Sequence, residues 1–133
     1  MDCKSLDFKQ NIDSFGVSYL CNFLDRAGFT ILEVNYAPNH PYQLLERIND
    51  KCMSIVVRTA CHPDIGTMDY TTLASLVRES EELCVSPHFA SLSLIPMETQ
   101  DIEVNGITEG QGHKVIFNGI IAVHDSESLA VNI

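Results

Sequence analysis

The most constraining feature of this sequence is a helical pattern that ends in a glycine and leads directly into a strand pattern. Six apolar residues recur there at three- and four-residue spacing: Phe15, Tyr19, Leu20, Phe23, Leu24 and Ala27. That spacing places them on one face of an α-helix over residues 13–27. Asp13 or Ser14 can cap its start, and Gly28 is suited to end it. Residues 29–36 then alternate apolar and polar positions, which is typical of a strand.

The remaining patterns predict further strands and one more helix. In order, they are strands at 42–48 and 53–60, a helix at 69–84, and strands at 88–95 and 112–124. Asp69 is the expected N-cap of the second helix, and Gly119 marks a possible bend in the last strand. No repeat or linker divides the chain. We therefore expect a single domain over residues 1–133, of the α/β (α+β) class, built around one mixed sheet.

The net charge of the chain argues against two classes of binding partner. The 133 residues include 8 Lys and Arg against 18 Asp and Glu, for a formal net charge of −10. Proteins that bind nucleic acid or an anionic membrane surface usually carry the opposite sign, so neither partner is expected. With 45% hydrophobic residues, the chain has enough apolar material for a core.

Targeting signals and cysteine usage bear on the compartment. The first residues lack the apolar core of a signal peptide, and no run approaches the roughly 18–20 apolar residues of a membrane span. The five cysteines have no C-x-x-C pair and are expected to be reduced thiols. These features predict a cytoplasmic, soluble protein.

The opening helix and strand also carry a motif of glycine, aromatic and aliphatic residues at fixed spacing: Gly16-x6-Phe23-Leu24-x3-Gly28-Phe29-x-Ile31-Leu32-x2-Asn35-Tyr36. This motif is similar to the start of small bacterial restriction-endonuclease-like proteins, in the Holliday-junction-resolvase-like branch of the PD-(D/E)XK nuclease superfamily. The predicted elements that follow match the α-β-β-β-α-β core of that family. The resemblance covers about residues 14–95 and leaves 96–133 as an acidic C-terminal strand or hairpin.

The resemblance implies a metal site that this sequence does not reproduce. Such nucleases carry an acid in the first helix, an acid on the second core strand and an acid-x-Lys pair on the third, so that carboxylates hold Mg²⁺. Here the first-helix position is Val17. Two strand registers are possible. One places Tyr42, Leu44, Val57 and Thr59 at the catalytic positions, and the other places Gln43, Leu45, Val56 and Arg58 there.

We favour the second register because side chains alternate across a strand. It puts Gln43, Arg47 and Arg58 on the side of the site, and Leu44, Ile48, Ile55 and Val57 on the buried side. Neither register supplies a carboxylate pair, so no catalytic residue, metal or cofactor is expected. The three polar residues could form a cationic pocket for an anion or a partner's carboxylate. Equally, the chain's own acids could neutralise the two arginines.

Other constellations have a plainer interpretation. Glu46 and Asp64 could be relocated metal carboxylates, although a solvated edge charge is the favoured interpretation of Glu46. Cys61-His62 could be a nucleophile and base, but adjacent strand residues point to opposite faces, and a strand end leading into a proline loop is favoured. The glycines of residues 106–112 do not open a helix as a phosphate loop does. No two of the five histidines are spaced as metal ligands: His40, His62, His88, His113 and His124.

The sequence therefore predicts a catalytically inactive nuclease-fold protein that acts as a binding or scaffold module, with an unknown protein partner or by self-association. The alternative is a nucleic-acid-processing enzyme or binder with a relocated metal site at Glu46 and Asp64. A third possibility is a small-molecule or acyl-transfer enzyme that uses Cys61 or a histidine.

Overall fold

The computed structural model describes residues 6–96 and 113–123, with side chains described within 12–95 and 114–123. Its elements are α1 (Leu6–Arg26), β1 (Thr30–Val34), β2 (Leu44–Ile48), β3 (Lys51–Cys61), α2 (Tyr70–Leu83), β4 (Ser86–Pro96) and β5 (His113–Ala122). This is the predicted α-β-β-β-α-β core with an added C-terminal strand, and the fold class is α+β. The predictions for residues 97–112, which include the glycines of 106–112, and for residues 124–133 lie outside the described residues.

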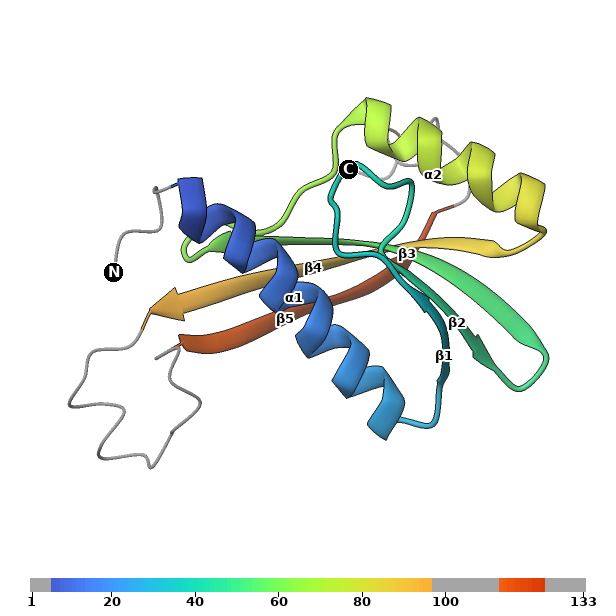
Figure 1. Ribbon diagram of the computed structural model, residues 1–133, viewed down its shortest axis with the longest axis horizontal. Helices are drawn as coiled ribbons and strands as arrows, with labels where there is room; N and C mark the ends of the chain where they lie inside the picture. Colours follow the sequence, from blue (N-terminus) through green and yellow to red (C-terminus); the bar gives the residue numbers. More distant parts are fainter. Residues whose placement is uncertain (1–5, 97–112, 124–133) are drawn as a thin grey trace.

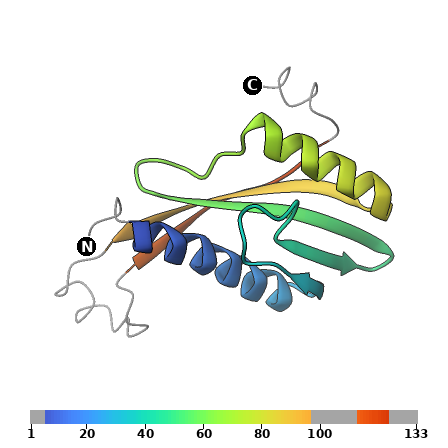
Figure 2. The ribbon, with the colours of Figure 1, turned by 45° about the horizontal axis from the view of Figure 1, so that its top comes forward.

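The five strands form one mixed sheet in the order β1-β2-β3-β4-β5. Only β3 and β4 run parallel, and the other neighbouring strands of this sheet are antiparallel. The parallel pair is joined through α2, as a parallel connection requires a crossover. Figure 1 shows α1 crossing one face of the sheet, and Figure 2 shows α2 on the opposite face. Neither helix in the described ranges is both long and apolar enough to cross a membrane.

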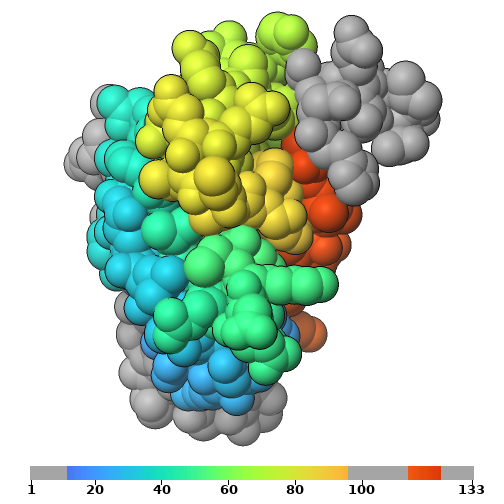
Figure 3. All heavy atoms as spheres, turned by 90° about the vertical axis from the view of Figure 1, so that its right-hand side faces the viewer, coloured from blue at the N-terminus to red at the C-terminus, as the bar shows by residue number. Residues whose placement is uncertain are grey.

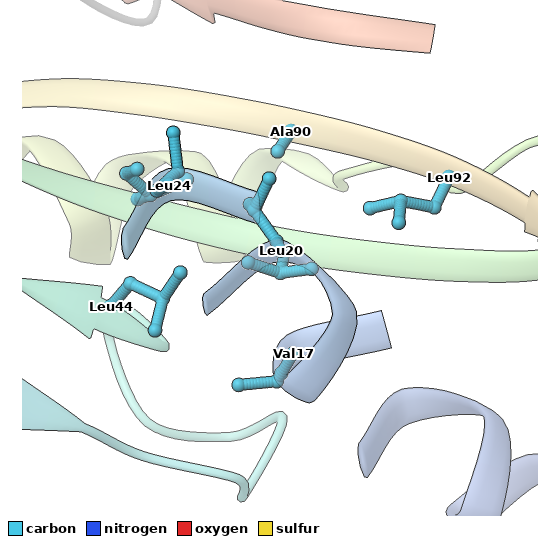
Figure 4. Close-up of a cluster of buried hydrophobic side chains, with 8 residues drawn as sticks. Val17, Leu20, Leu24, Leu44, Ala90 and Leu92 are labelled. Carbon is cyan, nitrogen blue, oxygen red and sulfur yellow. The ribbon is translucent and has the colours of Figure 1, made fainter. Parts of the chain in front are cut away.

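Each face of the sheet has its own hydrophobic core. The α1 core is formed by Val17, Leu20, Leu24, Leu44, Ile55, Val57, Ala90 and Leu92 (Figure 4). The α2 core is formed by Tyr42, Val56, Leu73, Leu76 and Val123. Because helices cover both faces of β3, its consecutive residues 55–57 are all buried, which accounts for the unbroken apolar run there.

The start of α1 differs from the sequence prediction. The helix begins at Leu6, seven positions before Asp13, so neither Asp13 nor Ser14 caps it. Ile12 explains part of the difference: it is only 4% exposed and lies four residues before Gly16, so the buried face of the helix begins before Asp13. The other end is as predicted, since α1 ends at Arg26 and Gly28 has a φ of 100°.

A tight turn joins two of the predicted strands, and the bend predicted at Gly119 is confirmed. Ile48 pairs with Lys51, so β2 and β3 form a tight hairpin, and Asn49 has a φ of 55°. This hairpin is seen in green between α2 and the C-terminal end of α1 in Figure 3. The β4–β5 register shifts between Ala90 and Leu92, and Gly119 there has a φ of 101°. The predicted bend is therefore a β-bulge on an edge strand.

The predicted N-cap of α2 is also confirmed. The Asp69 carboxylate accepts a hydrogen bond from the Thr72 amide at 2.8 Å. The loop that leads to this cap is fastened to β4 by two serine hydroxyls. Ser91 donates to the Gly66 carbonyl at 2.7 Å, and Ser93 donates to the Asp64 carbonyl at 2.9 Å.

Candidate functional site

Gln43 lies just before β2 and is the centre of a polar cluster against β3. Its side chain is 1% exposed, and both ends of its carboxamide are bonded. The oxygen accepts from the Val57 amide at 2.9 Å and from Arg58 Nη1 at 3.2 Å. The nitrogen donates to the Ala37 carbonyl at 3.0 Å and the His40 carbonyl at 3.3 Å. A neutral carboxamide thus joins the loop 37–41 to the middle of β3.

Arg58 extends the same cluster. Its Nη1 also donates to the Val57 carbonyl at 3.1 Å, and its Nη2 donates to the Pro38 carbonyl at 2.9 Å. The guanidinium therefore bonds neutral acceptors on β3, on Gln43 and on the loop before β2. Gln43 and Arg58 are in contact, as the favoured register predicts, and the other two hydrogen bonds of the guanidinium go to backbone carbonyls, of Val57 and Pro38.

Two carboxylates lie near this guanidinium. Burial lowers the pKa of Arg58, while the charges of Asp13 and Asp69 act in the opposite direction. Burial raises the pKa of Asp13, partly offset by the positive charge of Arg58. The pKa of Asp69 is lowered mainly by its hydrogen bonds from Thr72, with Arg58 a smaller cause. The chain's own acids thus oppose the positive potential that an anion site would need.

Asp13 is a site residue that the sequence interpretation missed. The position expected for a helix acid, Val17, is 1% exposed and belongs to the α1 core (Figure 4). One turn earlier, Asp13 is near enough to Arg58 for their charges to interact. The signal was the three-residue spacing between Asp13 and Gly16, which puts both on one side of the helix. Gly16 faces β3 so closely that an added Cβ would overlap the Thr59 hydroxyl.

A second polar group fixes the loop that carries these carbonyls. The Tyr42 hydroxyl donates to Glu33 Oε1 at 2.9 Å, and Asn35 Nδ2 donates to Glu33 Oε2 at 2.9 Å. Burial, then the contact with Glu33, raises the pKa of Tyr42 to about 12. The same two hydrogen bonds lower the pKa of Glu33. The residues on either side of loop 37–41 are therefore held at β1.

Glu46 corrects one sequence expectation. It was expected to be a solvated edge charge, but its side chain is 0% exposed and neither carboxylate oxygen has a hydrogen-bond partner. The reason is the sheet order, because β1 lies outside β2 and α1 covers that face. Burial raises the pKa of Glu46 to about 7. The Thr59 hydroxyl on β3 is likewise buried without a partner.

The other predicted site residues are not gathered with Gln43 and Arg58. Glu46 pairs with Met53 near the start of β3, whereas the exposed Asp64 follows the end of that strand at Cys61. The two carboxylates proposed for a relocated metal site are thus at opposite ends of β3. Arg47 is exposed and pairs with Thr30 and Cys52 in the sheet. Within the described ranges, no three His, Cys, Asp or Glu residues are grouped to hold a metal.

The cysteines differ in state. Cys21, Cys52 and Cys84 are free thiols, as expected, but Cys61 is disulfide-bonded, so the expectation of a reduced thiol is wrong at that position. This state does not favour Cys61 as a nucleophile, since a thiolate is the reactive form. The adjacent His62 is exposed, and its amide donates to the Leu94 carbonyl at 2.8 Å, continuing the β3–β4 ladder.

Comparison with known proteins identifies a family without an assigned activity. No protein of curated function matches the chain. Among solved structures, the fold is similar to Hjc, a Holliday junction resolvase from the archaeal hyperthermophile Archaeoglobus fulgidus, at 13% identity and a TM-score of 0.48. That similarity covers 87% of this chain and 97% of Hjc. The model of DUF8840, a domain of unknown function, matches residues 10–123, and the chain therefore belongs to the DUF8840 family.

Proposed function

We propose that this protein is a nuclease-fold binding module without nuclease chemistry, which acts through a protein partner or a second copy of itself. The observation that carries the proposal is the Gln43–Arg58 contact at 3.2 Å. In the nucleases that the sequence resembles, the second and third core strands bring acids together at the metal. Here the carboxamide of Gln43, just before the second of these strands, meets the guanidinium of Arg58 on the third, and neither group is a good ligand for Mg²⁺.

The electrostatics of the chain support the same proposal. A net charge of −10 opposes association with a phosphate backbone. The same charge favours a partner with a basic surface, because complementary potentials speed encounter and select partners. A protein with a basic docking face is therefore the class of partner we expect, and binding to it should weaken as salt is added.

A cleavage and binding assay tests the loss of nuclease chemistry. The protein is incubated with four-way-junction, nicked and plain duplex DNA, with Mg²⁺ or Mn²⁺, and in parallel gel-shift experiments at low salt. We expect no turnover above the buffer control and no salt-sensitive shift. Turnover that EDTA abolishes and that Arg58→Gln removes, while Arg47→Gln retains it, would overturn the proposal. Arg47 is a suitable control because it is an exposed cation on the adjacent strand.

A second measurement tests the association itself. Sedimentation over a concentration series reports self-association of the purified chain. Chemical cross-linking in the native cell, followed by reconstitution of the pair from purified components, tests a separate partner. We expect a stable complex in one of the two. Affinity for a basic partner should fall as ionic strength rises, whereas self-association of two copies of net charge −10 should not weaken. A chain that stays monomeric and forms no reconstituted pair would contradict a binding role.

A further inference from the structure

Glu46 lies inside the packing between α1 and the sheet, and the proposed function does not use it. On β2 it pairs with Ile31 of β1 on one side and Met53 of β3 on the other. Both neighbours pack against the α1 core, as does Cys21 of α1. Figure 4 shows Leu44, two residues before Glu46 on the same side of β2, close to the α1 side chains. The carboxyl group is therefore enclosed by apolar side chains beneath the helix.

The charged and titratable groups on the surrounding elements offer it no compensation. On α1, the Cys21 thiol is near enough for Glu46 to raise its pKa, after burial as the larger cause and with Asp25 as a further one. On β1, the Glu33 carboxylate is bonded to Tyr42 and Asn35. No hydrogen-bond donor reaches either oxygen of Glu46 within the described part of the chain.

The cations nearest in the sheet do not pair with it either. Lys51 lies two residues before Met53 on β3 and is exposed at the hairpin. Arg47 is exposed, and as the next residue of β2 its side chain leaves the opposite face of the strand. Burial is the cause of the raised pKa of Glu46. An ionised carboxylate at this place would be both dehydrated and unpaired.

We propose that Glu46 makes the docking of α1 on the sheet depend on pH, so that the neutral carboxyl keeps the helix packed and the ionised carboxylate favours a locally opened helix. Opening α1 lets water reach the ionised carboxylate, and the free energy of this hydration favours the open state. Opening also moves Asp13 away from Arg58, because Asp13 belongs to α1 and Arg58 to β3. This device is separate from the proposed binding role and can hold or fail independently of it.

The pH range follows from the two states of the carboxyl. A glutamate in water has a pKa of 4.5, and Glu46 in the packed state has a pKa of about 7. Between these values the open state binds fewer protons than the packed one. The opening equilibrium constant of α1 should therefore rise roughly tenfold per pH unit from about pH 5 to about pH 6.5, and should level off above about pH 7.

Hydrogen exchange at single amides of the full chain tests the proposal. After correction for the intrinsic pH dependence of exchange, the protection of α1 amides should fall roughly tenfold per pH unit between about pH 5 and about pH 6.5. The protection of α2 amides should change much less. Glu46→Gln should abolish the pH dependence, and Glu46→Met provides a second neutral variant if the first folds poorly. Glu33→Gln is the matched control on the neighbouring strand and should keep it, since the pKa of Glu33 is lowered and lies below this range.

The free thiols give an independent readout. Cys21 belongs to α1 and is partly buried, and Cys84 is exposed at the end of α2. The label is 4,4′-dithiodipyridine, a reagent that reacts at mildly acidic pH. The labelling rate should rise with pH more steeply at Cys21 than at Cys84, and this difference should disappear in Glu46→Gln. Equal pH dependence at the two thiols, equal loss of protection in α1 and α2, or an unchanged α1 profile in Glu46→Gln would each overturn the proposal.

Discussion

The Gln43 side-chain oxygen accepts a hydrogen bond from Arg58 at 3.2 Å while it also accepts one from the Val57 amide at 2.9 Å. Gln43 lies just before the first residue of β2, and its side chain bonds a backbone amide of β3 that a neighbouring strand would otherwise bond. A carboxylate could accept the same two bonds, but it could not donate to Ala37 and His40 as the Gln43 amide does. The carboxamide is therefore matched to this position as a structural connector.

Replacing Gln43 should destabilise the protein. In Gln43→Leu, the Val57 amide and the Ala37 carbonyl lose buried partners, and the guanidinium of Arg58 loses one acceptor. Unsatisfied buried groups cost about 1–3 kcal/mol each, so we expect a loss of roughly 2–4 kcal/mol in the free energy of unfolding, measured by urea denaturation. Asn39→Ala, an exposed change in the same loop, should stay within about 0.5 kcal/mol. A comparable small loss for Gln43→Leu would show that water replaces these bonds.

The close approach of α1 to β3 should make Gly16 intolerant of a side chain. An added Cβ would overlap the Thr59 hydroxyl and crowd the Thr59 Cβ as well. Gly16→Ala should therefore cost about 1–3 kcal/mol despite the better helix propensity of alanine. In the double variant with Thr59→Ala, most of this cost should disappear. Simple additivity of the two substitutions in thermal unfolding would mean that the helix shifts instead of clashing.

The unpartnered Thr59 hydroxyl leads to a stabilising substitution. It is buried without a hydrogen-bond partner, so its desolvation is uncompensated. Thr59→Val keeps the shape and removes the polar atom, and we expect a gain of about 1 kcal/mol in the free energy of unfolding. Thr71→Val on the exposed side of α2 is the matched control, with an expected change within about 0.5 kcal/mol. A destabilised Thr59→Val would indicate that the hydroxyl finds water or another partner in solution.

The order of elements could be predicted from the sequence because periodicity, caps and turns are local signals. The helix ending before Gly28, the N-cap at Asp69 and the bend at Gly119 all depend on residues close in the chain. Burial of Glu46 is different in kind. It depends on β1 pairing outside β2 and on α1 crossing above, and neither follows from the residues around position 46.

The site shows the same limit. The Gln43–Arg58 meeting was within reach, since one register of two strands predicted it. The contribution of Asp13 was not, because the sequence pattern predicts a helix that starts seven residues later than α1 does, with Asp13 as a candidate cap. Arg47 was grouped with Arg58 by alternation alone, but the hydrogen bonds of Arg58 go to the loop before β2. The position of loop 37–41 against β3, which depends on contacts distant in the sequence, therefore determines that Arg58 and not Arg47 joins Gln43.

The buried carboxyl of Glu46 should also leave a signature in global stability. With a pKa raised from 4.5 to about 7, its stabilising protonated form is fully present below about pH 4.5 and is lost as pH rises through 7. That shift corresponds to about 3 kcal/mol in the free energy of unfolding. Glu46→Met should therefore gain more stability over the wild type at pH 8 than at pH 4.5, by about that amount, in urea titrations at a series of pH values.

Glu33 supplies the control for this prediction because its pKa is shifted the other way. Its hydrogen bonds from Asn35 and Tyr42 lower the pKa, so its stabilisation is present above the unfolded value of 4.5 and is lost as pH falls through the folded value. Glu33→Gln should consequently flatten the acid side of the stability profile and leave the range from pH 4.5 to 7 unchanged. If Glu46→Met and the wild type keep parallel profiles over that range, the carboxyl is already hydrated in the folded protein, and its burial beneath α1 does not persist in solution.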